Sequence, residues 1–83
     1  MIQIVYFARV RETLGMDGEL FAAERGTKIA ELIDQLAGQS ERHAAAFSDR
    51  SKLRFALDHT MVHADAVLNG AIELAIFPPV TGG

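Results

Sequence analysis

Cysteine and tryptophan are absent from this 83-residue chain, and proline occurs only twice. Without cysteine the chain has no disulfides, no thiolate metal ligands and no cysteine nucleophile. No apolar run approaches the roughly 20 residues that cross a bilayer, so the sequence predicts no membrane-spanning helix. The net charge of −3 argues against nucleic acid or an anionic membrane as the main partner.

The length and composition of the chain fit one small globular domain. Hydrophobic residues make up 49% of the chain and charged residues 23%, which is typical of a folded protein and not of a disordered one. Eighty-three residues are too few for two hydrophobic cores. The stretch from Met1 to Ile4 has no basic segment, so no secretory signal is expected. Together with the lack of cysteine, this favours the cytoplasm.

Strand and helix patterns follow one another along the chain. The amphipathic spacing of Ile29, Leu32, Ile33 and Leu36 predicts a main helix that runs from an N-cap at Thr27 to Ala37. Ser40 is a candidate cap for a short second helix that extends to Phe47. Alternation and turn residues predict strands over 2–7, 19–23, 55–57, 60–62 and 72–77, with turns at 58–59 and 69–70 and surface loops over 8–18 and 48–54.

This order predicts an α+β fold, a mixed sheet of about five strands with one main helix packed on one face. The first and last strands are the most apolar, so they are expected to lie side by side in the centre. Their helix-facing residues are then Ile2, Ile4 and Tyr6 in one strand, and Ile72, Leu74 and Ile76 in the other.

The other face of these two strands is also apolar. It carries Val5, Phe7, Ala75 and Phe77, because successive side chains alternate between faces. Exposed apolar patches on small domains often bind partners, and we expect this one to do so. The alternative is that one of the two long loops folds over it.

The chain closes with Pro78-Pro79-Val80-Thr81-Gly82-Gly83 directly after the last strand. Prolines favour an extended course, and glycine fits channels too narrow for other residues. Six extended residues reach on the order of 20 Å. We therefore divide the chain into a domain of residues 1–77 and an extended Gly-Gly tail of residues 78–83.

These features resemble the small, sulfur-carrying subunits of molybdopterin synthase, a ubiquitin-like family with the β-grasp fold. The resemblance rests on Phe7-Ala8-Arg9-Val10-Arg11-Glu12, the 27–37 helix and, above all, the ending from Ala75 to Gly83. Asp58 departs from the family, which commonly has Asn there. Asn69-Gly70-Ala71-Ile72-Glu73 likewise replaces the usual acidic turn.

The resemblance implies that Gly83 is the chemical centre. An activating enzyme that uses ATP and Mg²⁺ would adenylate its carboxylate, and sulfur would replace AMP to give a thiocarboxylate. The tail from Pro78 to Gly82 would thread into the large subunit of a heterotetrameric synthase. There the sulfur would pass to cyclic pyranopterin monophosphate and build the dithiolene. This chain would bind no cofactor and would not be catalytic alone, because the general acids and bases belong to the large subunit.

The expected partner interface comprises Val5, Phe7, Arg11, Ala75 and Phe77. Two other functions stay open: a sulfur carrier for thiamine or another thiolated product, and a ubiquitin-like protein modifier that is joined to lysines.

Other candidate sites are weaker. His59 and His63 have no third ligand nearby in sequence, so we expect solvated histidines and no metal. Thr27 and Ser40 are better explained as helix caps than as nucleophiles, because neither has a base at a useful spacing.

Overall fold

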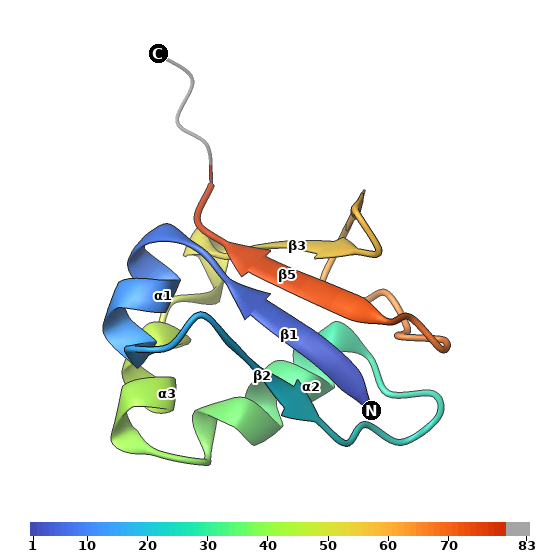
Figure 1. Ribbon diagram of the computed structural model, residues 1–83, viewed down its shortest axis with the longest axis horizontal. Coiled ribbons are helices and arrows are strands. Elements are labelled where there is room, and N and C mark those ends of the chain that lie inside the picture. Colours follow the sequence, from blue (N-terminus) through green and yellow to red (C-terminus); the bar gives the residue numbers. More distant parts are fainter. Residues whose placement is uncertain (80–83) are drawn as a thin grey trace.

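The computed structural model describes residues 1–79 and consists of one five-stranded mixed sheet with helices on one side (Figure 1). The strand order is β2–β1–β5–β3–β4. β1 and β5 are parallel, and the other neighbouring pairs are antiparallel. The strands are β1 (Ile2–Tyr6), β2 (Gly18–Phe21), β3 (Arg54–Leu57), β4 (Thr60–Val62) and β5 (Glu73–Phe77).

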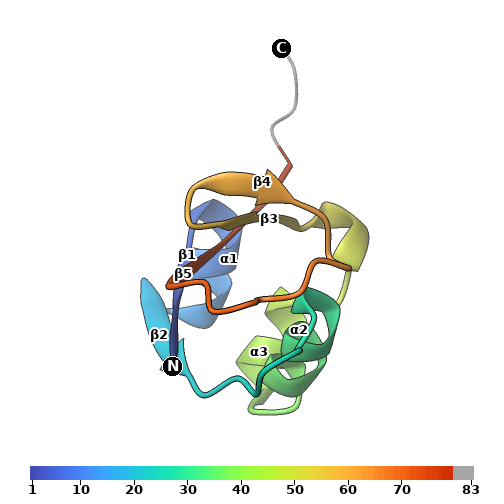
Figure 2. The ribbon, with the colours of Figure 1, turned by 90° about the vertical axis from the view of Figure 1, so that its right-hand side faces the viewer.

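Three α-helices and one 3₁₀ helix complete the domain: α1 (Ala8–Leu14), α2 (Ile29–Ala37), α3 (Glu41–Ala46) and η1 (Arg50–Lys52). The sheet curves around α2 and α3 (Figure 2), and α1 packs against α3. This arrangement is the β-grasp fold, and it confirms the predicted α+β class and the central pairing of the first and last strands. Among residues 1–79, no helix has the length and apolar character that a membrane span requires.

The core lies between α2 and the inner face of the sheet. Ile29, Leu32, Ile33 and Leu36 of α2 are fully buried, and each such side chain contributes about 1.5–3 kcal/mol by leaving water. They meet the inward residues of the central strands, which are Ile2, Ile4, Tyr6, Leu74 and Ile76.

The prediction that Ile72 faces the helix was wrong. Ile72 is 76% exposed, because the chain bends there and β5 begins only at Glu73. The alternation that puts Leu74 and Ile76 inside therefore does not extend back to Ile72.

The predicted N-cap at Thr27 was also wrong, since Lys28 occupies that position. The Thr27 hydroxyl donates instead to the carbonyl oxygen of Glu24 at 2.6 Å. The first free N–H groups of α2 are satisfied by another segment: Ile29 N–H donates to Ala66 O and Ala30 N–H to Ala64 O. A distant backbone thus replaces the local cap that the sequence pattern indicated.

Two glycines hold the α1–β2 connection in place. Gly15 ends α1 with φ 72° and donates its N–H to Arg11 O, in the left-handed conformation that glycine adopts most readily. Gly18 begins β2 where a side-chain carbon would collide with the carbonyl oxygen of Ile4. The long 8–18 segment is therefore tied back to β1 and to the helix side, and it leaves the other face of the sheet open.

Candidate functional site

The end of β5 forms the root of the tail. Phe77 closes the strand, and Pro78 and Pro79 are half-buried against the domain. The remaining tail positions expected to act, Val80, Thr81, Gly82 and Gly83, lie outside the described residues. The site that the structure describes is therefore the surface around the root.

On one side of the root lies the outer face of the sheet, the face turned away from α2. One row of aligned residues crosses all five strands on this face, in the order Gly18, Val5, Ala75, Ala56 and Met61. All of these residues are apolar or lack a side chain. Figure 1 looks onto this face, with α2 behind the strands. The row is therefore a shallow apolar surface that one docking protein could cover.

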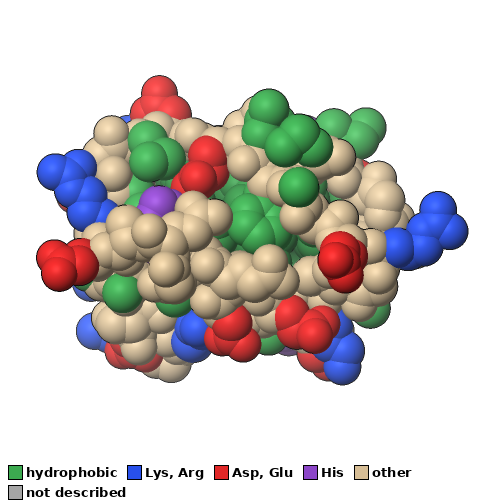
Figure 3. Space-filling model, turned by 90° about the horizontal axis from the view of Figure 1, so that it is seen from below, with side chains coloured by type: hydrophobic (Ala, Val, Ile, Leu, Met, Phe, Trp, Pro, Cys, Tyr) green, Lys and Arg blue, Asp and Glu red, His purple; other side chains and the backbone are tan. Residues whose placement is uncertain are grey.

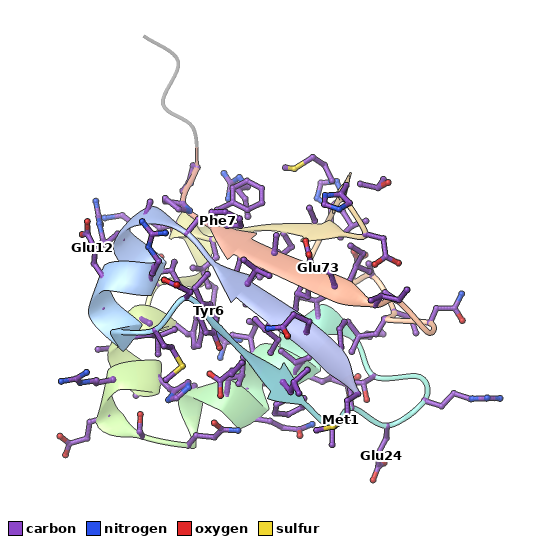
Figure 4. The ribbon with its side chains drawn as sticks, in the orientation of Figure 1. Met1, Tyr6, Phe7, Glu12, Glu24 and Glu73 are labelled. Atoms are coloured by element: carbon purple, nitrogen blue, oxygen red, sulfur yellow. The ribbon has the colours of Figure 1, made fainter. Side chains whose placement is uncertain are left out.

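Phe7 and Phe77 stand where this surface meets the root. Tyr6 is aligned with Ile76 in the parallel β1–β5 pair, so the next residue of each strand is a phenylalanine. The Phe7 N–H donates to Ile76 O at 3.1 Å, which fixes this register. Phe7 is 43% exposed and Phe77 is half-buried. Figure 4 shows Phe7 beside the end of β5, far from Met1 and Glu24 at the other end of the sheet.

The structure thus brings Val5, Phe7, Ala75 and Phe77 onto the face that alternation predicted. Arg11 is placed differently, because it belongs to α1 and not to the sheet. Its guanidinium lies 3.9 Å from the carboxylate of Asp17, and both side chains are well exposed. A pair of this kind contributes little to stability, so Arg11 is available to a partner.

Sequence reasoning missed a partly buried polar cluster on the inner side. The Tyr6 hydroxyl donates to Glu19 Oε2 at 2.6 Å, and His43 Nε2 lies 2.8 Å from the same oxygen. Ser40 Oγ accepts from the His43 N–H and lies 2.7 Å from His43 Nδ1. Burial, and then the Glu19 carboxylate that accepts its hydrogen bond, raise the pKa of Tyr6 well above its ordinary value.

This cluster joins β1, β2 and α3 through side chains that are 24 residues apart in sequence at the widest contact. Of these contacts, only the Ser40 cap could be predicted from the neighbouring sequence. The hydroxyl of Ser40 caps α3 through the His43 N–H, and His43 meets Glu19 of β2, so these contacts link the helix to the sheet.

The two histidines weighed as metal ligands flank a short strand. His59 sits in the β3–β4 turn with φ 72°, beside Asp58 with φ 46°. His63 follows β4, on the margin of a surface hollow near Arg50 and Arg54. The turn is the one predicted at residues 58–59, with both central residues left-handed as in tight hairpins.

Asp58, one of the two departures from the family pattern, has a clear structural role. Its carboxylate accepts the N–H groups of Ile72 and Glu73 at 3.0 and 2.9 Å. It therefore fixes the start of β5 from the neighbouring hairpin. An asparagine could supply the same acceptor oxygen.

Comparison with known proteins gives a consistent result. Residues 4–83 match the ThiS family. The chain is 43% identical over 83 residues to the molybdopterin synthase sulfur carrier subunit of Escherichia coli strain K12, and 32% identical to that of Haemophilus influenzae. Both alignments cover the whole of each chain.

Solved structures agree on the fold. A Pyrococcus furiosus protein assigned as subunit 1 of a molybdopterin converting factor superposes with a TM-score of 0.75 at 26% identity, covering 95% of this chain and 97% of the other. Small archaeal modifier protein 1 of Haloferax volcanii superposes with a TM-score of 0.76 over the same shares at 21% identity. The second likeness concerns the fold alone.

Proposed function

The chain belongs to the ThiS family, and on that premise we propose that it is the sulfur carrier subunit of a molybdopterin synthase. The observation that carries the proposal is the full-length match, at 43% identity, to a bacterial protein of that name. The outer face supports it, because a carrier needs a surface beside the tail root for the protein that receives the tail.

The chemistry we propose takes place at Gly83. A free carboxylate is a poor acyl donor because oxide is a poor leaving group. In the activating enzyme, the Gly83 carboxylate attacks the α-phosphorus of Mg²⁺-bound ATP and releases pyrophosphate. A nucleophile at the oxidation level of sulfide (HS⁻) then attacks the carbonyl and AMP leaves, which gives the thiocarboxylate. Glycines at 82 and 83 let this end pass through a narrow channel.

In the synthase, the thiocarboxylate sulfur attacks a carbon of cyclic pyranopterin monophosphate, and a C–S bond forms there as a C–O bond of the substrate breaks. Water then cleaves the acyl–sulfur bond and restores the Gly83 carboxylate, and two such transfers complete the dithiolene. General acids and bases for these steps belong to the large subunit. The residues of this chain position the tail: Pro78 and Pro79 stiffen its root, while Phe7, Phe77, Val5, Ala75 and Arg11 hold the partner.

The first test is intact-mass spectrometry of the protein purified from its native host. The proposal expects a species heavier than the free chain by one sulfur less one oxygen. Conjugates of much higher mass would identify a protein modifier instead, and a sulfur-bearing chain without molybdopterin synthesis would identify a carrier for another thiolated product.

The second test uses the tail itself. Deleting Gly83, or adding one residue after it, should abolish molybdopterin formation in a reconstituted assay and leave the thermal unfolding of the domain unchanged. Unchanged product formation with either variant would exclude Gly83 as the carrier position.

A further inference from the structure

A hollow of about 470 Å³ opens on the helix side of the tail root. We call it the root groove. Its floor is apolar and is formed by Val10 of α1, Leu53 and the two prolines of the tail root, Pro78 and Pro79. α3 supplies one wall, which includes Ala45. The groove and the outer face therefore lie on opposite sides of the same tail.

The rim of the root groove carries two cations, Arg9 and Lys52. Among residues 1–79 neither takes part in an ion pair. The one carboxylate on the rim, Asp49, accepts hydrogen bonds from the N–H and hydroxyl of Ser51. The hydroxyl of Ser51, then its N–H and the charge of Lys52, hold the pKa of Asp49 below its usual range. Asp49 is thus bound mainly within its own turn, and the side chains of Arg9 and Lys52 remain exposed to a partner.

Positively charged side chains adjoin the tail root. Arg9 and Lys52 line the root groove together with Pro78 and Pro79, and Arg54 is aligned with Phe77. One carboxylate, that of Asp49, lines the same groove.

The chain as a whole is acidic, with a net charge of −3. Seen from the side away from the root, carboxylates and basic side chains both stand along the margin (Figure 3). A partner that approaches the tail therefore meets a positive rim on an acidic protein, which favours an acidic counterpart.

We propose that the root groove is a second contact surface for the large subunit that receives the tail, and that it takes an apolar side chain flanked by a carboxylate from the mouth of the tail channel. The inference rests on the proposed function and extends its interface around the root. A channel that encloses a tail must meet the domain on every side of the point where the tail leaves. The outer face offers Phe7 and Phe77 on one side, and the root groove is the apolar surface on the other.

Binding measurements with two pairs of variants of the full chain test this proposal. Ala45→Trp fills the groove, and Ala44→Trp places the same side chain on the neighbouring, exposed position of α3 that does not line it. Lys52→Glu reverses the charge of the rim. Lys28→Glu makes the same change at the only other lysine of the chain, next to the start of α2.

Titration calorimetry against the large subunit measures the dissociation constant of each variant. Ala45→Trp and Lys52→Glu should each raise the dissociation constant at least about tenfold, as for groups at the centre of an interface. Ala44→Trp and Lys28→Glu should stay within about twofold of the wild type, as for substitutions outside the contact. The loss from Lys52→Glu should shrink at high salt, because exposed charges are screened. Lys52 is exposed, so this variant serves even where Ala45→Trp unfolds the domain.

Two results would overturn the proposal. In one, all four variants bind like the wild type. In the other, the groove variants bind the large subunit normally but lose adenylation by the activating enzyme, measured by ATP–pyrophosphate exchange. Failure of the proposed function looks different, because the wild-type chain itself would then neither bind the large subunit nor carry sulfur.

Discussion

At the scale of single residues, the buried hydroxyl of Tyr6 makes the fold sensitive to alkali. A tyrosine whose pKa is raised in the folded state stabilises the fold fully below its unfolded value of about 10 and loses this contribution as the pH rises further. We expect the unfolding free energy to fall above about pH 10, because ionised Tyr6 would be buried away from water and would face the Glu19 carboxylate.

The ionisation of Tyr6 can be followed directly because Tyr6 is the only tyrosine of the chain. Denaturant melts across the alkaline range should show the fall, and Tyr6→Phe should flatten it. Tyrosinate absorbance should appear only as the protein unfolds. Ionisation of Tyr6 at its ordinary pKa in the folded protein would contradict the prediction.

Asp58 allows a second prediction at this scale. Asp58→Ala removes the acceptor for two N–H groups and places alanine at a φ of 46°. We expect a loss of about 1–2 kcal/mol in the unfolding free energy. Asp58→Asn should lose less than about 1 kcal/mol, because asparagine keeps an acceptor and tolerates this conformation. Chemical denaturation of the two variants decides it, and equal losses would mean that the two hydrogen bonds are not what fixes β5.

At the scale of elements, the sequence predicted what is local and missed what is distant. The hydrophobic spacing located α2, and a serine located the start of α3, because both signals lie within a few residues. The start of α2 has one local contact, from the Lys28 N–H to the Glu31 carboxylate, and two contacts to the distant carbonyls of Ala64 and Ala66. No pattern of neighbouring residues predicts the two distant contacts. α1 was missed, because residues 8–18 were predicted as a surface loop. The helix has seven residues and begins at Ala8 with φ 49°.

The predicted cap of α3 can be tested directly. Ser40→Ala should lower the unfolding free energy by about 1–2 kcal/mol, since it removes the acceptor for the His43 N–H. Ser40→Asp keeps an acceptor and should lose much less. Thermal unfolding of each variant measures the loss of stability. An unchanged stability of Ser40→Ala would show that His43 and Glu19 hold α3 without the cap.

At the scale of the whole molecule, we expect the α2 side of the sheet to provide most of the stability and the outer face to provide one of the two partner contacts. Leu32 is fully buried on the α2 side, and Leu32→Ala should cost about 2–5 kcal/mol of unfolding free energy. Phe77→Ala should cost the free domain less. Its main effect should be on binding to the large subunit, weakened at least about tenfold, since burying one phenylalanine contributes about 1.5–3 kcal/mol.

Titration calorimetry and denaturant melts on Leu32→Ala, Phe77→Ala and Phe7→Ala separate the two effects. Phe7→Ala should act in the same direction as Phe77→Ala. If Phe77→Ala unfolds the domain and binds normally when folded, the outer face supports the fold and does not bind the partner. The faces themselves were predictable from alternation alone, whereas the groove behind the root needed the packing of α1 against α3.

The place of β5 in the middle of the sheet also bears on how the protein is made. Among the strands of residues 1–79, β5 is synthesised last, yet it joins β1, the first, to β3. Pairing of segments so far apart in sequence is slow and forms late. Until residue 77 has left the ribosome, the nascent chain holds two half-sheets with nothing between them. Residues 78–83 follow this strand, so any chain long enough to offer them already contains the strand that completes its domain.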